Sequence, residues 1–139
     1  MVAEQEQRFG RIPVKSWLSF KTHPVRQLAA EWIRSGRGVE VVSEAELVAV
    51  RALGCPAPQL LINGVGKHTW MHRHVIPGAR IHVDSPREAD VLLPLAGAQG
   101  WRIGLRCHVP TEYDARERSF GGQFGMTADE FGATHLILN

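Results

Sequence analysis

The chain has 139 residues, of which 44% are hydrophobic and 22% charged, and its formal net charge is +2. This composition is typical of a soluble globular domain and argues against disordered, collagen-like and coiled-coil proteins. Lysine and arginine form no run that would favour nucleic acid. No apolar stretch approaches the roughly 20 residues that a membrane span requires. We therefore expect a globular protein that binds neither nucleic acid nor a membrane.

The N-terminal segment and the two cysteines indicate the cellular compartment in which the protein is expected. Residues 1–13 form a polar segment that lacks the apolar centre of a secretory signal, and residues 14–139 are expected to form one domain. Cys55 and Cys107 fit no metal spacing. One disulfide between them is open in principle, but two free thiols in a reducing compartment are favoured. We therefore expect a cytoplasmic protein.

Strand and helix patterns alternate from residue 14 onward. The first half is expected to hold, in chain order, a strand at 14–21, a helix at 24–35, a strand at 39–42 and a helix at 44–53. The second half is expected to hold a strand at 59–62, a weak helix at 69–76, a strand at 81–83, a helix at 86–96, a strand at 103–109 and a polar loop at 110–125. Thr127-Ala-Asp-Glu130 then has the form of a capping box that opens a last helix. Alternating βα units of this length indicate an α/β fold with a parallel sheet.

Each expected strand stops at a polar residue, and these strand ends recur at intervals of 22, 20, 21 and 22 residues: Lys21, Ser43, Asn63, Asp84 and Arg106. A regular βα period with polar strand ends describes the rim of a barrel, where the chemistry of (β/α)₈ enzymes is found. A doubly wound sheet usually has a glycine-rich loop after its first strand, and this chain has none there. The pattern therefore predicts a partial (β/α)₈ barrel of about five βα units. A complete barrel needs about 200 residues or more, so we expect a fragment or a truncated relative with open sheet edges.

Six segments in chain order carry a resemblance to a known family: Ser19-Phe-Lys-Thr-His-Pro24, Gly38-Val-Glu-Val-Val-Ser-Glu-Ala-Glu46, Ile62-Asn-Gly-Val-Gly-Lys67, Val83-Asp-Ser-Pro-Arg-Glu88, Gly104-Leu-Arg106 and Gln123-Phe-Gly-Met126. Together they resemble the N-terminal part of the alanine-racemase-like barrel in fold-type III pyridoxal phosphate (PLP) decarboxylases, such as diaminopimelate and ornithine decarboxylases. The resemblance covers about residues 14 to 130. The chain departs from the family at Gln123, where many relatives have lysine, and at Glu40, where many have aspartate.

The resemblance implies roles for the residues of the rim. Lys21 would be the catalytic lysine that forms the Schiff base with PLP, although by position alone it could be a solvated lysine. Arg106 would lie near the phenolic oxygen of the cofactor, or form a salt bridge inside the barrel with Glu40. A carboxylate inside a strand is costly unless it is paired, so Glu40 is expected to contact PLP or Arg106. Ser43 and His108 are further cofactor-binding candidates, and for both a structural role is equally open.

Three other groups of residues receive structural interpretations. Glu46 is expected to cap its helix. His68, His72 and His74 lie close together, but they lack an acidic or cysteine partner at ligand spacing, and no metal site is predicted. The glycines near the end of the polar loop indicate a tight turn or a flap: Gly121, Gly122 and Gly125.

The resemblance implies PLP-dependent decarboxylation of an amino acid, either diaminopimelate or another basic or dibasic one. The alternative is a non-catalytic PLP-binding or pseudo-enzyme domain that regulates a complete homologue, which the departure at Gln123 favours. The family also implies a homodimer in the full-length form. The 139 residues alone are expected to associate through their open edges and to be inactive.

Overall fold

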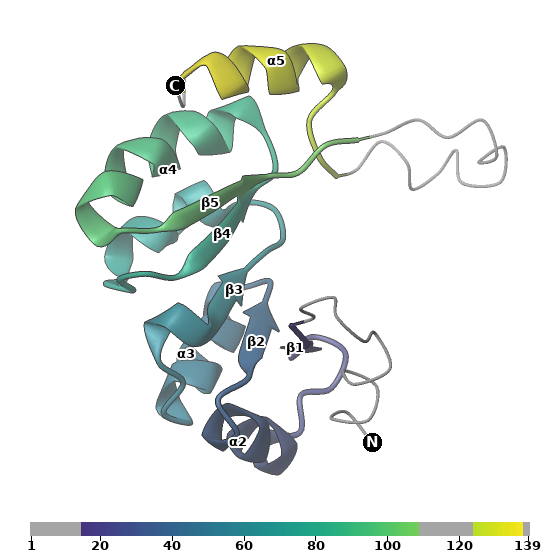
Figure 1. The fold of residues 1–139 in the computed structure, drawn as a ribbon, viewed down its shortest axis with the longest axis vertical. Helices are drawn as coiled ribbons and strands as arrows, with labels where there is room; N and C mark the ends of the chain where they lie inside the picture. The colour runs from purple at the N-terminus through teal and green to yellow at the C-terminus, as the bar shows by residue number, and fades with distance from the viewer. Residues whose placement is uncertain (1–14, 109–123, 138–139) are drawn as a thin grey trace, which may run out of the picture.

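The computed structural model describes residues 15–108 and 124–137, and its centre is a five-stranded sheet (Figure 1). All neighbouring strands are parallel, and their order in the sheet is the order in the chain. The strands are β1 (Trp17–Ser19), β2 (Gly38–Val41), β3 (Leu60–Ile62), β4 (Arg80–Val83) and β5 (Arg102–Leu105). This topology confirms the predicted α/β class and the partial (β/α)₈ barrel, in which each new strand adds to the same edge.

Helical segments follow the strands in the predicted alternation. They are α2 (Arg26–Arg34), α3 (Glu44–Ala52), the 3₁₀ helices η1 (Ala57–Gln59), η2 (Lys67–Thr69) and η3 (Met71–Arg73), then α4 (Pro86–Gln99) and α5 (Ala128–Ile137). The helix α5 lies against α4 (Figure 1). Among the described residues, no helix is both long and apolar enough to span a bilayer.

The two faces of the sheet differ in chemistry because side chains alternate along each strand. One face packs against the helices, and Val41, Ile62 and Ile81 lie there side by side in the register of neighbouring strands, with no exposed surface. We call the opposite face the inner face, and define it by the half-buried residues that alternate with the core: Trp17, Ser19, Glu40, Leu61, His82 and Gly104. In a closed barrel this face lines the interior.

Three helices begin with the same device, a serine or threonine followed three residues later by glutamate. The hydroxyl oxygens of Ser43, Ser85 and Thr127 each accept from the backbone N–H of that glutamate, at 3.3 Å in all three. Each glutamate carboxylate in turn accepts a backbone N–H at the start of its helix. The predicted capping box at Thr127 and the predicted capping role of Glu46 are therefore confirmed. A cap of this kind stabilises a helix by about 1 kcal/mol.

The structure corrects three predicted boundaries. The first strand ends at Ser19 and not at Lys21, because the Thr22 hydroxyl and the His23 N–H turn back to donate to the Ser19 carbonyl. The weak helix predicted at 69–76 is replaced by η2 and η3, since Trp70 between them departs from helical geometry with φ −136° and ψ −23°. The fifth strand ends at Leu105, beyond which Cys107 forms an isolated bridge to Met126. Residues 110–123 of the predicted loop, with Gly121 and Gly122, lie outside the described residues.

Both cysteines are free, as predicted. Cys55 is buried, and burial raises the pKa of its thiol to about 11. Cys107 is exposed next to the end of β5.

Candidate functional site

The carboxyl ends of the five parallel strands meet at one rim, and Lys21 lies there on an exposed turn. It is the second residue after β1, between the buried Phe20 and the turn-forming Thr22. The Phe20 N–H donates to the Glu40 carbonyl at 3.0 Å, which fixes this turn to β2. Within the described residues, no hydrogen bond or ion pair occupies the Lys21 amine. The amine is therefore available to a ligand.

Arg106 follows β5 at the same rim, and its guanidinium is held from two sides. Its Nη1 lies 3.3 Å from Oδ1 of Asp84, the residue that follows β4, and the guanidinium carbon lies 4.6 Å from the centre of the Phe124 ring. The Arg106 side chain is 37% exposed and that of Asp84 only 4%. The cation is thus anchored to a buried carboxylate while one side of it remains open.

The alternative that the sequence left open for Arg106, a salt bridge with Glu40, is not what the structure shows. The Arg106 N–H donates to the carbonyl of Val83 at 2.9 Å, which places Arg106 beside the end of β4, where Asp84 is the nearest carboxylate. Glu40 lies on β2, three strands away from β5, and accepts instead from Nδ2 of Asn63 at 2.8 Å. The other polar atom of Asn63, its Oδ1, is buried and has no hydrogen-bond partner in the part of the chain that the structure describes. This buried acceptor is an unmet polar contact at the rim.

The remaining two candidates are already engaged in local structure. The hydroxyl of Ser43 accepts from Glu46 as the N-cap of α3. The backbone N–H of His108 donates to the Met126 carbonyl at 2.8 Å, and its side chain is partly exposed. Both lie near the rim, and within residues 15–108 and 124–137 neither side chain forms a hydrogen bond or ion pair with Lys21, Glu40 or Arg106.

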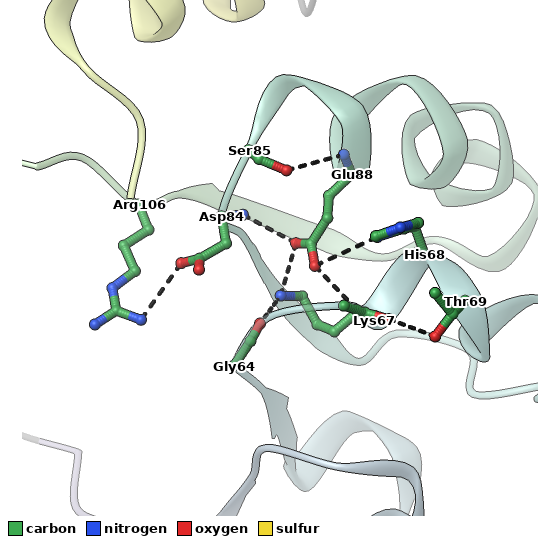
Figure 2. A network of polar contacts seen from close by, with 9 residues as sticks. Gly64, Lys67, His68, Thr69, Asp84, Ser85, Glu88 and Arg106 are labelled. Atoms are coloured by element: carbon green, nitrogen blue, oxygen red, sulfur yellow. Dashed lines mark hydrogen bonds and ion pairs between the residues drawn. The ribbon is translucent and has the colours of Figure 1, made fainter. Parts of the chain in front are cut away.

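A buried ion pair beneath the rim was missed by the sequence interpretation. Lys67 and Glu88 have side chains that are 0% and 2% exposed, and Nζ of Lys67 lies 2.8 Å from Oε2 of Glu88 (Figure 2). The Lys67 amine also donates to the carbonyl of Gly64. Both residues belonged to segments that carried the resemblance, but a lysine and a glutamate 21 residues apart give no periodic signal of contact. Ser85-Pro-Arg-Glu88 has the form of a capping box, and this signal in the sequence places Glu88 at the start of α4.

His82 is a third residue that the sequence interpretation missed. It lies on the inner face of β4, in register with Gly104 of β5. A Cβ atom at Gly104 would lie 2.8 Å from Cδ2 of His82, so only glycine leaves room for the imidazole there. Burial lowers the pKa of His82, and the positive charges of Lys67 and Arg106 lower it further, against the negative charge of Glu40. Burial and the two nearby cations therefore disfavour the protonated imidazole.

This lowered pKa predicts a pH-dependent stability that His82→Gln removes. Because the folded protein resists protonation at His82, the unfolded chain binds the proton first as the pH falls below 6.5, the ordinary value. The free energy of unfolding should therefore decrease below pH 6.5 more steeply in the wild type than in the variant, and the two should run parallel above it. Urea unfolding across this range measures the difference. The exposed His72, changed to Gln, is the control, and an equal effect of both substitutions would contradict the assignment.

His68, His72 and His74, which lie close together in the sequence, do not point at a common site. His74 contacts Glu44 at 2.8 Å and His68 lies 3.9 Å from Glu88, whereas His72 is exposed. Glu44 also pairs with Arg73 at 2.6 Å, and these contacts lower its pKa, with the His74 hydrogen bond as the main cause. Among the described residues, no three histidine, cysteine or acidic side chains are grouped as metal ligands.

Comparison with known proteins gives matches in sequence and in fold. No family model matches the chain. The biosynthetic arginine decarboxylase of Rhodopirellula baltica is 31% identical over 120 residues, which cover 76% of this chain and 17% of that protein. The chain thus spans about a sixth of the length of this curated relative.

Two solved structures share the fold. The diaminopimelate decarboxylase of M. jannaschii superposes with a TM-score of 0.69 at 17% identity, over 99% of this chain and 34% of that one. The arginine decarboxylase of Paramecium bursaria Chlorella virus has a TM-score of 0.69 at 15% identity, over 96% and 35%. In sequence and in fold, the chain therefore corresponds to the N-terminal part of the barrel in fold-type III pyridoxal phosphate decarboxylases.

Proposed function

We propose that this chain forms the lysine-bearing part of a PLP-dependent amino-acid decarboxylase, with Lys21 as the residue that holds the cofactor. The observation that carries the proposal is the placement of the lysines. The sequence has three: Lys15, Lys21 and Lys67. Lys67 is buried in an ion pair, and Lys15 precedes β1 at the opposite end of the sheet. Lys21 alone combines a free amine with a place at the carboxyl ends of the strands, where barrel enzymes carry their chemistry.

The polar groups at the rim fit such a cofactor. The aldehyde of PLP reacts with an amine, its phenolic oxygen attracts a cation, and its other polar ring substituents can form further hydrogen bonds. The exposed amine of Lys21 and the half-open guanidinium of Arg106 supply the first two. The buried and unpartnered Oδ1 of Asn63, next to Glu40, supplies an acceptor for a third. The hydroxyl of Ser43 already caps its helix, and His108 lies beyond the end of β5. Both would therefore contribute least to binding the cofactor.

In this proposal each residue has a limited task. When bound, PLP supplies the electron sink that makes loss of a carboxylate from an amino acid feasible. Lys21 provides the amine nucleophile that keeps the cofactor in place. Arg106, anchored by Asp84, presents a positive charge to the phenolic oxygen, and Phe124 covers one side of that charge from water. Glu40, held by Asn63, keeps a negative charge on the inner face near His82.

The substrate class that we propose is a basic or dibasic amino acid. The relatives are named for arginine and diaminopimelate, and both substrates carry a second charged end beyond the reacting carbon. The alternative function, a non-catalytic PLP-binding domain, is favoured by Gln123, which replaces the lysine of many relatives. We further propose that the full-length protein is a homodimer. In the described part of the chain, β1 and β5 each pair on one side only, and unpaired strand edges favour association.

A decarboxylation assay on two proteins tests the proposal: the full reading frame that encodes this chain, and the 139 residues alone. With PLP, the full protein should release CO₂ from diaminopimelate, ornithine, lysine or arginine, and the 139 residues should not. PLP binding by the full protein without CO₂ release would favour the non-catalytic alternative. The absence of any PLP binding would contradict both. Turnover by a monomer of the 139 residues would overturn the expectation that they are incomplete.

A further inference from the structure

The buried carboxylate of Glu88 does more than begin a helix. Its Oε1 accepts the backbone N–H of Lys67 at 2.9 Å, and its Oε2 accepts the backbone N–H of Asp84 at 3.0 Å (Figure 2). Oε2 also lies 2.8 Å from Nζ of Lys67. One side chain thus joins the turn after β3, the end of β4 and the start of α4.

Asp84 links this buried site to the rim. Asp84, whose backbone is held by Glu88, directs its own carboxylate at Arg106. Since the Asp84 side chain is buried, its position follows the position of its backbone closely. A shift of that backbone would move the oxygen to which Arg106 is anchored. The ion pair Lys67–Glu88 is therefore two contacts away from a guanidinium on the open side of the rim.

The neighbouring helix α3 provides an internal comparison. Glu46 has the same place in its capping box: it accepts the backbone N–H of Val42 at 3.0 Å, and its own N–H donates to Ser43. Within the described residues Glu46 has no cationic partner, and its carboxylate joins no second turn. Capping alone therefore requires neither the burial of Glu88 nor its pairing with Lys67. These two additional features need another reason.

We propose that Glu88 and Lys67 are positioning residues that fix the orientation of Arg106 through Asp84. The role of Arg106 toward PLP rests on the proposed function, whereas the coupling between Glu88 and Arg106 does not. A glutamine at position 88 has one acceptor oxygen in place of two, so it can satisfy either the Lys67 N–H or the Asp84 N–H, and its NH₂ group faces a donor on the other side. Glu88→Gln should therefore loosen Asp84 and release Arg106, and Glu46→Gln is the matched control.

Two measurements on the full protein separate the possibilities. Modification of Arg106 by phenylglyoxal, followed by peptide mass mapping, reports the freedom of the guanidinium without PLP. Titration with PLP, followed by its absorbance, reports binding. In Glu88→Gln we expect faster modification of Arg106 and a Kd for PLP about tenfold higher, which is the effect of one lost polar interaction of moderate strength. Glu46→Gln should change neither. Arg106→Met identifies the modified peptide.

The outcomes are distinct. A lower melting temperature in Glu88→Gln with unchanged Arg106 modification would make the pair merely structural and overturn the proposal. Faster modification of Arg106 in a protein that never binds PLP would support the positioning and contradict the proposed function. If Glu88→Gln folds poorly, Lys67→Met/Glu88→Gln removes both charges, and the same rise in Arg106 modification is expected there. An unchanged rate in the double variant would also count against the proposal.

Discussion

Lys21→Ala is expected to abolish the covalent attachment of PLP. Reduction with borohydride in the presence of PLP should fix the cofactor to Lys21 in the wild type, and peptide mapping should find the label on that residue. The expectation is sharp because only three lysines compete, and the other two are excluded by position or burial. An amine that lacks a cofactor pocket reacts only weakly, so specific labelling also requires the rim around Lys21.

Lys15→Ala is the matched control for this experiment. Lys15 is exposed like Lys21 and lies at the other end of β1, so it reports the reactivity of a surface lysine in the same protein. Its removal should leave the label on Lys21 unchanged. Label that persists at full yield in Lys21→Ala, on Lys15, on Lys67 or on the terminal amine, would contradict the assignment. The PLP absorbance of each variant before reduction gives a second, independent measure of binding.

The sequence was sufficient to predict the parallel sheet, because both of its signals are local. Buried strands such as β2 (Gly38–Val41) follow helices that end beside a glycine, here Gly36 after α2, and the polar strand ends recur at nearly constant intervals. The predictions were weaker where a long-range contact decides the structure. The turn at Lys21 depends on the Thr22 hydroxyl and on the attachment of Phe20 to β2, and a strand pattern alone extends through it.

The site shows the same division between local and distant contacts. The strand-end spacing correctly placed Asp84 and Arg106 on one rim, but not their pairing, because two carboxylates were available and only the order of strands in the sheet chooses Asp84 over Glu40. His82 was missed since a histidine between Ile81 and Val83 looks like any polar residue on the open side of a strand. Its significance depends on Gly104 of the next strand, which leaves the space for its ring.

Lys67→Met should lower the free energy of unfolding by about 3–5 kcal/mol, the range typical of breaking a buried ion pair from one side. The methionine fills a similar volume, so the loss is electrostatic: Glu88 remains buried without its cation, and the Gly64 carbonyl loses its donor. Urea unfolding of the purified chain measures the effect. The exposed Lys15, replaced by methionine in the same way, should change the stability little.

The double variant Lys67→Met/Glu88→Gln decides whether the loss comes from an unpaired charge. With both charges removed, the buried site no longer holds a lone carboxylate, and part of the stability lost in Lys67→Met should return; the backbone N–H that glutamine leaves without an acceptor limits the recovery. The free energy of unfolding of Glu88→Gln alone should lie between those of Lys67→Met and the double variant. The reason is that Glu88→Gln leaves a buried lysine, which can lose its charge by deprotonation within the protein. If the double variant is instead as unstable as the sum of the two single variants, the pair contributes through packing and capping, and the ionic interpretation of Lys67 fails. A double variant with restored stability but faster modification of Arg106 would separate the two roles of Glu88. The stability of the fold would then not depend on the two charges, whereas the orientation of Arg106 would.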